Sequence, residues 1–178
     1  MNYSALKKLD VANGPGVRVT LFVSGCTNHC EGCFQPQTWD FNFGRPFTDL
    51  VMQEILEALS LPYVAGFTLL GGEPMEPANQ PSVLSILQQV RKAFPKKSIW
   101  LFSGFTFEKL LKPGEYPNTP AVSAILNHLD VLVDGPFILA RKDLMLRFRG
   151  SNNQRLLDVP ASLEAGTPVL WTDGYTRC

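Results

Sequence analysis

Three cysteines, Cys26, Cys30 and Cys33, occur within eight residues of the chain in the pattern C-x3-C-x2-C. Thiolates so close in sequence are expected to converge on one metal centre. A 4Fe-4S cluster needs four ligands, so three cysteines can hold it and leave one iron open to a small molecule. The spacing therefore predicts that these three cysteines bind a cluster that performs chemistry and does more than carry electrons.

Other uses of clustered cysteines fit this sequence less well. A structural zinc site needs four protein ligands, and only His29 and Cys178 are spare candidates. A disulfide needs an oxidising compartment, and the N-terminal residues lack the basic start, apolar core and cleavage site of a secretion signal. The bacterial ferredoxin pattern has different gaps and a fourth cysteine. We therefore expect an iron-sulfur protein of the cytoplasm.

The composition is that of an ordinary soluble protein. The chain has 178 residues, of which 45% are hydrophobic and 18% are charged, so we expect one domain spanning residues 1–178. Sixteen basic residues balance sixteen acidic ones, and no basic stripe suggests a nucleic-acid partner. No apolar run approaches the length of about 20 residues that crosses a bilayer, so we expect no membrane contact.

Short apolar runs alternate with helical stripes along the chain, which is typical of parallel strands joined by helices. The predicted strands are 17–24, 66–70, 98–103, 130–134 and 168–172. Two helices are predicted to begin at Thr48 and Pro81, and two more are predicted over 122–129 and 161–165. These units are too few for a closed eight-stranded barrel. The pattern predicts an α/β fold, either a partial barrel or an open, curved and mostly parallel sheet with the cluster in its mouth.

A second motif, Gly71-Gly72-Glu73-Pro74, follows the second predicted strand directly. Because the carboxyl ends of parallel strands share one edge of a sheet, this loop is expected beside the cysteine loop. Two glycines allow the backbone to approach a ligand closely. The carboxylate of Glu73 and the exposed carbonyls suit a cationic amino group, although such a sequence can also form a plain strand-to-helix turn.

The two motifs together resemble those of the radical S-adenosylmethionine (SAM) enzymes, in which a GGE-type motif follows C-x3-C-x2-C. The resemblance implies that SAM binds the open iron through its amino and carboxylate groups. It also implies one-electron cleavage of SAM to methionine and a 5′-deoxyadenosyl radical. Many relatives have an aromatic residue before the third cysteine, where this chain has Gly32. The resemblance gives the cofactor-binding set as Gly32, Cys33, Phe34, Gly71, Gly72, Glu73, Ser103 and Asp134.

Further motifs resemble one family of these enzymes, the activating proteins of anaerobic (class III) ribonucleoside-triphosphate reductase. They are NGPG at 13–16 followed by Arg18, TWD at 38–40, SGF at 103–105, DVLVDGPF at 130–137 and RGSNNQR at 149–155. The resemblance implies that the protein takes an electron from a low-potential donor such as flavodoxin. The resemblance also implies that the protein then installs a glycyl radical on the partner reductase.

Several alternatives remain open at this point. Pro136 replaces the lysine of an Asp-x-Lys pattern in larger activases, so Asp134 could simply cap a strand, and RGSNNQR could bind the partner, bind SAM or form a surface turn. Cys178 could be a spare terminal thiol. The rival functions are a compact radical SAM enzyme acting on a small molecule, like 7-carboxy-7-deazaguanine synthase, and a noncatalytic iron-sulfur electron-transfer protein.

Overall fold

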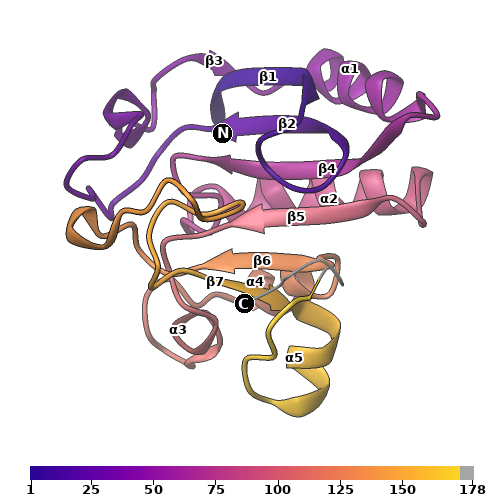
Figure 1. Cartoon of the computed structure of the whole chain (residues 1–178). Coiled ribbons are helices and arrows are strands. Elements are labelled where there is room, and N and C mark those ends of the chain that lie inside the picture. Colours follow the sequence, from indigo (N-terminus) through magenta and orange to yellow (C-terminus); the bar gives the residue numbers. More distant parts are fainter. Residues whose placement is uncertain (173–178) are drawn as a thin grey trace.

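A seven-stranded mixed sheet lies at the centre of the computed structural model, which describes residues 1–172 (Figure 1). The strand order across the sheet is β3-β1-β2-β4-β5-β6-β7. The strands are β1 Asn2–Asp10, β2 Val17–Val23, β3 Arg45–Pro46, β4 Val64–Gly71, β5 Ser98–Phe102, β6 Val131–Asp134 and β7 Arg155–Asp158.

The four central strands β2, β4, β5 and β6 are parallel, and antiparallel strands flank them on both sides. Val23, the last residue of β2, pairs with Gly71, the last residue of β4. The cysteine loop and the GGE loop therefore leave the sheet side by side, as expected from the sequence.

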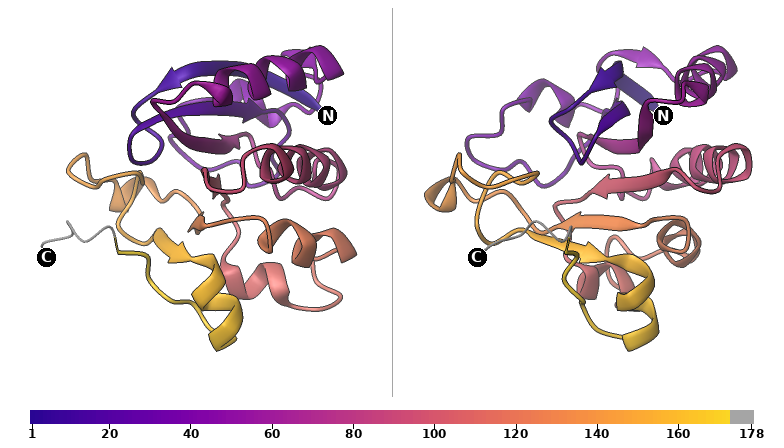
Figure 2. Two further views of the ribbon diagram at one scale, coloured as in Figure 1. Left: turned by 90° about the vertical axis from the view of Figure 1, so that its right-hand side faces the viewer. Right: turned by 45° about the vertical axis from the view of Figure 1, so that its right-hand side comes forward.

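Three helices cover one face of the sheet (Figures 1 and 2). They are α1 Asp49–Ser60, α2 Gln80–Ala93 and α4 Pro120–Leu126. Each turns an apolar stripe toward the strands, and the stripes are buried in one core with the strand side chains. The stripes are Val51, Ile55 and Leu59 in α1, Val83, Leu87 and Val90 in α2, and Val122, Ile125 and Leu126 in α4.

The other face of the sheet carries a smaller apolar cluster centred on Trp100 of β5. Its indole packs edge-on against the rings of Phe148 and Trp171, at centroid distances of 5.4 and 4.9 Å. The segment that follows β6 therefore folds back over this face. It reaches the ends of the central strands, where it closes one side of a cavity.

The predicted α/β class is confirmed, with a mixed sheet that is parallel at its centre. The four central strands and the helices that cover them are where the patterns place them. The barrel-like curvature stays a prediction. The sequence reading missed the flanking strands β1, β3 and β7 and the helix α3, Phe107–Leu111, and it placed the short α5, Val159–Ala165, two residues late.

The predicted last strand, 168–172, is wrong. Only Leu170 pairs there, in an isolated bridge to Leu157 of β7. Cys178 lies outside the described residues. Among the helices of residues 1–172, none combines the length and the apolar character needed to cross a bilayer.

Candidate active site

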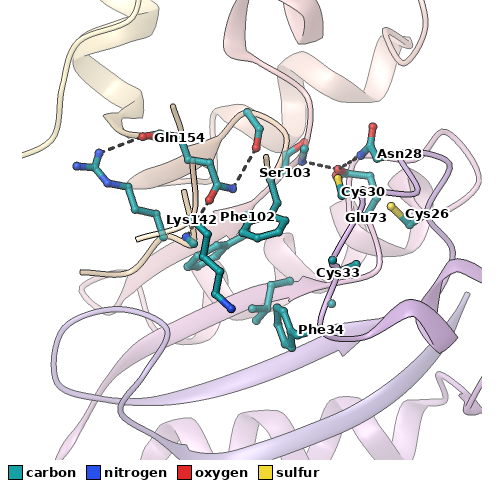
Figure 3. A pocket seen from close by; sticks show the side chains of 18 of the residues that line it. Cys26, Asn28, Cys30, Cys33, Phe34, Glu73, Phe102, Ser103, Lys142 and Gln154 are labelled. Carbon is teal, nitrogen blue, oxygen red and sulfur yellow. Dashed lines mark hydrogen bonds between the residues drawn. The ribbon is translucent and has the colours of Figure 1, made fainter. Parts of the chain in front are cut away.

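A cavity of about 490 Å³ opens at the carboxyl ends of the central strands (Figure 3). Its wall comes from the cysteine loop, from the loops after β4 and β5, and from the segment after β6. Nine of the residues predicted from sequence line it, namely Cys26, Cys30, Gly32, Cys33, Phe34, Gly71, Gly72, Glu73 and Ser103. The fold therefore brings both motifs to one site.

The three thiols belong to a tightly curled loop. His29 and Gly32 have left-handed backbone conformations, with φ of 44° and 71°, and the Cys33 amide donates a 3.1 Å hydrogen bond to the Cys30 carbonyl. Burial raises the pKa of the Cys26 thiol to about 11 and also raises that of Cys30. These thiols stay protonated until a cation lowers their pKa, as a bound metal does.

The three thiols differ in their fit to a single metal ion and to a cluster. Within residues 1–172, no three cysteine, histidine or acidic side chains are gathered closely enough to hold a single metal ion. Cys26, Cys30 and Cys33 nevertheless share one cavity wall. Ligands of a four-iron cube bind different irons and lie farther apart than ligands of one ion. Three thiols spread along a wall therefore fit a cluster better than they fit zinc.

The Gly71-Gly72 pair is required by the close approach of two loops. The Gly72 amide donates to the Val23 carbonyl at 2.7 Å, and the Glu73 amide donates to the Gly25 carbonyl at 2.8 Å. A Cβ on Gly72 would lie 2.6 Å from the Gly25 oxygen. No side chain fits in this space. The two glycines are therefore needed for the packing of the two loops, in addition to any contact they make with a ligand.

Glu73 is buried at the junction of three loops. Its Oε2 accepts hydrogen bonds from the Gly104 amide at 2.6 Å and from Asn28 Nδ2 at 3.1 Å (Figure 3). Its Oε1 accepts a hydrogen bond from the Met75 amide at 2.9 Å. Burial raises the pKa of this carboxyl to about 7. A carboxylate held in this way, at the cavity wall, is well suited to receive a cationic group.

Glu76 supports the site from outside the cavity wall and was not predicted from the sequence. Its buried carboxylate accepts hydrogen bonds from the backbone amide and the hydroxyl of Thr27, both at 2.7 Å, and from the hydroxyl of Tyr116. It thereby anchors the residue that follows Cys26. The only signal in the sequence is a second acidic residue three positions after Glu73, which by itself points to no partner.

The rest of the cavity wall is mostly apolar. Ser103 lies at the end of β5, where its hydroxyl accepts a 3.0 Å hydrogen bond from the Phe105 amide. The larger apolar side chains come from the cysteine loop and the residues after it, from β4 and β5, and from the segment after β6, and they are Phe34, Trp39, Leu70, Phe102, Phe137, Leu144, Leu146 and Phe148. Such a wall can hold a flat, largely apolar ring.

Asp134 does not line this cavity, in contrast to the prediction. Its fully buried carboxylate accepts from Arg155 Nε at 2.9 Å and from the Phe107 amide at 2.7 Å. Arg155 also binds both carboxylate oxygens of Glu108, at 3.0 and 2.8 Å. These partners raise the pKa of Arg155 and lower that of Glu108 to about 2. Asp134 therefore ties the end of β6 to α3 and β7.

The RGSNNQR segment is divided between the cavity and the protein interior. Arg149, Gly150 and Gln154 line the cavity, whereas Arg155 turns away to Asp134. Gln154 bonds within the segment through its Oε1, which accepts from the Gly150 amide at 2.9 Å, and ties the segment to the end of β6 through its Nε2, which donates to the Gly135 carbonyl at 3.1 Å. The segment forms a turn that bonds to itself and to the residues after β6, while within the described residues Arg149 Nε and Asn153 Oδ1 are buried without a hydrogen-bond partner.

The NGPG turn packs against the side chain of Arg18, which is fully buried. Arg18 donates to the Thr68 hydroxyl at 2.7 Å and to the Phe67 carbonyl at 2.7 Å. Burial lowers its pKa to about 10. A Cβ on Gly14 would lie 2.8 Å from the Arg18 side chain. The turn therefore packs on a buried cation and presents Asn13 to the cavity.

Comparison with known proteins matches this chain to an iron-sulfur domain, in agreement with the three cysteines of the cavity. The family model described as "4Fe-4S single cluster domain" matches residues 12–157. Curated relatives named anaerobic ribonucleoside-triphosphate reductase-activating protein include those of Escherichia coli K12, 38% identical, and Vibrio cholerae, 41% identical, each over 86% of this chain and 96% of the relative. The relative from Enterobacteria phage T4 is 38% identical over 88% of this chain and 93% of its own. The chain belongs to the family of anaerobic ribonucleoside-triphosphate reductase-activating proteins.

Proposed function

We propose that this protein is a radical SAM activase that generates a glycyl radical on the anaerobic ribonucleoside-triphosphate reductase. The observation that carries the proposal is the single cavity shared by Cys26, Cys30, Cys33 and the GGE loop. Family membership supports the choice of partner, because the relatives are named for activating that reductase. A radical SAM fold with barrel-like curvature is part of the proposal.

The three cysteines would hold a 4Fe-4S cluster, and SAM would occupy the rest of the cavity. When bound, the reduced cluster supplies the electron that splits SAM, and the resulting 5′-deoxyadenosyl radical removes a hydrogen atom from glycine. A low-potential donor such as flavodoxin would provide that electron. The remaining steps of binding and orientation belong to the protein.

Glu73 is placed to receive the amino group of SAM. Its buried carboxylate already binds Gly104 and Asn28, so it is fixed in position before the ligand arrives. An arriving cation would stabilise the ionised form that burial disfavours. Gly71 and Gly72 line the same cavity, so their backbone would lie within reach of that ligand.

The apolar wall is placed to hold the adenine ring. Phe34, with the backbone from Gly32 onward, forms one side of the cavity, and Phe102 lies at the end of β5. Ser103 adds a polar group at that strand end. Asp134 would act at a distance, by fixing the strand end and the turn that follows it, and would not touch the cofactor.

The test is an anaerobic reaction of the cluster-loaded, reduced protein with SAM and the partner reductase, followed by electron paramagnetic resonance. We expect a glycyl radical signal on the reductase, and none when Cys30 is replaced by alanine. An intact cluster with no signal on the reductase would overturn the proposal. Chromatography of the products separates the rivals, because an electron-transfer protein makes no 5′-deoxyadenosine from SAM.

A further inference from the structure

Exposed apolar side chains gather at the mouth of the cavity. Within residues 1–172, the three most exposed large apolar residues are Met145, Leu144 and Phe34, at 88%, 86% and 80%. Leu144 and Phe34 line the cavity, and Met145 follows Leu144 directly. Exposed apolar groups that cluster in this way mark interaction sites more often than isolated ones do.

The segment that carries two of these side chains is held rigidly at its base. The Asp143 amide donates to the Gly150 carbonyl at 3.2 Å, the Asn152 amide donates to the Arg141 carbonyl at 3.0 Å, and Lys142 forms an isolated bridge with Ser151. We call residues 141–150 the mouth hairpin. Figure 1 shows this part of the chain beyond the carboxyl ends of the central strands. A pre-formed hairpin loses little entropy when a partner binds it.

The mouth hairpin is also strongly cationic. It contains four basic residues and one acidic residue, a net charge of 4 − 1 = +3, in a chain whose formal net charge is 0. Its basic residues are Arg141, Lys142, Arg147 and Arg149. In the described chain, Arg141 and Lys142 are exposed and form no ion pair. Arginine and methionine are among the residues enriched in protein interfaces.

We propose that the mouth hairpin and Phe34 form the docking surface for the partner reductase, at a region of that protein with an apolar centre and carboxylates around it. The proposal rests on the proposed function, which supplies the partner. Docking at the cavity mouth brings the polypeptide substrate to the place where hydrogen would be removed. A second copy of this chain fits poorly, because a symmetric contact would place two hairpins of the same charge together.

The test uses two exposed residues that do not line the cavity, Met145 and Arg141. The variants Met145→Asp and Arg141→Glu remove the apolar and the cationic contribution separately. The matched controls are Tyr63→Asp and Lys96→Glu, two exposed residues that precede β4 and β5 at the opposite edge of the sheet. Dissociation constants for the reductase are measured by biolayer interferometry at low and high salt.

We expect each hairpin variant to bind the reductase at least tenfold more weakly and each control to bind like the wild type. Binding of the wild type should weaken with added salt, and that dependence should be smaller for Arg141→Glu. Cleavage of SAM without the reductase should be unchanged in all four variants. Reductase binding equal to that of the wild type in both hairpin variants would overturn the docking proposal and leave the proposed function standing.

The two proposals can fail separately. If the wild type cleaves no SAM, the proposed function fails, and the binding constants still decide whether the hairpin docks the reductase. If the hairpin variants lose affinity for the electron donor but keep it for the reductase, the docking proposal is wrong.

Discussion

Replacing Glu73 by glutamine should remove a specific pH dependence of the protein's stability. Burial raises the pKa of Glu73 from 4.5 to about 7 in the folded protein. Between these values the folded state keeps a proton that the unfolded state has released. The free energy of unfolding therefore falls as the pH rises through this window.

The size of the effect follows from the shift in pKa. A difference of about 2.5 units, at about 1.4 kcal/mol per unit, corresponds to roughly 3 kcal/mol lost between pH 4.5 and pH 7. The assay is urea denaturation of the metal-free, reduced protein at pH 5 and at pH 8. The Glu73→Gln variant should lose about 2.5 kcal/mol less than the wild type between the two pH values, because its amide does not ionise and a small part of the effect lies below pH 5.

The quantity compared is the change in unfolding free energy between the two pH values. Stability that the variant loses equally at both pH values, for example through weaker hydrogen bonds, therefore cancels. Glu57→Gln serves as the control, because Glu57 is exposed on α1 and its replacement should leave the pH dependence unchanged. Equal pH dependence in the wild type and in Glu73→Gln would refute the reasoning. Glu73 would then be an ordinary carboxylate, and its suitability for a cation would lose its physical basis.

Further substitutions test the framework around the site. Arg155→Met leaves the buried carboxylate of Asp134 without its cation and should cost about 3–5 kcal/mol in unfolding free energy, measured by urea denaturation. Glu108→Gln, at the exposed end of the same network, should cost less than about 1 kcal/mol in that assay, and equal losses would contradict this order. Gly72→Ala places a Cβ 2.6 Å from the Gly25 oxygen and should displace the cysteine loop. Its iron content after reconstitution should fall well below that of the wild type, and an unchanged content would contradict the close packing.

The central part of the fold could be predicted because its signals are local. The apolar runs of the parallel strands and the stripes of the helices are each visible within a dozen residues, and both are buried in the structure. The strand β1 was missed because its sequence, NYSALKKLD, is largely polar and only two of its nine residues are buried. The strand β7 has four residues, and it exists only because the chain folds back beside β6.

The last predicted strand failed for a related reason. The apolar residues near Trp171 suggested a strand, but its indole turns to pack on Trp100 and the local pairing stops at Leu170. Contacts between aromatic residues far apart in sequence give no periodic signal, so they could not be read from the sequence.

The site could be predicted where a short motif contains the residues that act together. The spacing of the cysteines and the position of the GGE loop after a strand placed both motifs at one edge of the sheet, and the cavity confirms that placement. The role of Asp134 depends on the antiparallel register of β6 and β7, which sets it opposite Arg155. The role of Glu76 depends on its contact with Thr27. Both are set by tertiary structure and leave no local pattern.

The central claim, hydrogen removal from a glycine of the partner, is tested most directly by isotope transfer. Reductase labelled with glycine deuterated at the α-carbon is incubated anaerobically with the reduced protein and SAM, and the 5′-deoxyadenosine is examined by mass spectrometry. The account predicts that this product gains one deuterium atom. Formation of 5′-deoxyadenosine without deuterium, while a radical appears on the reductase, would contradict it.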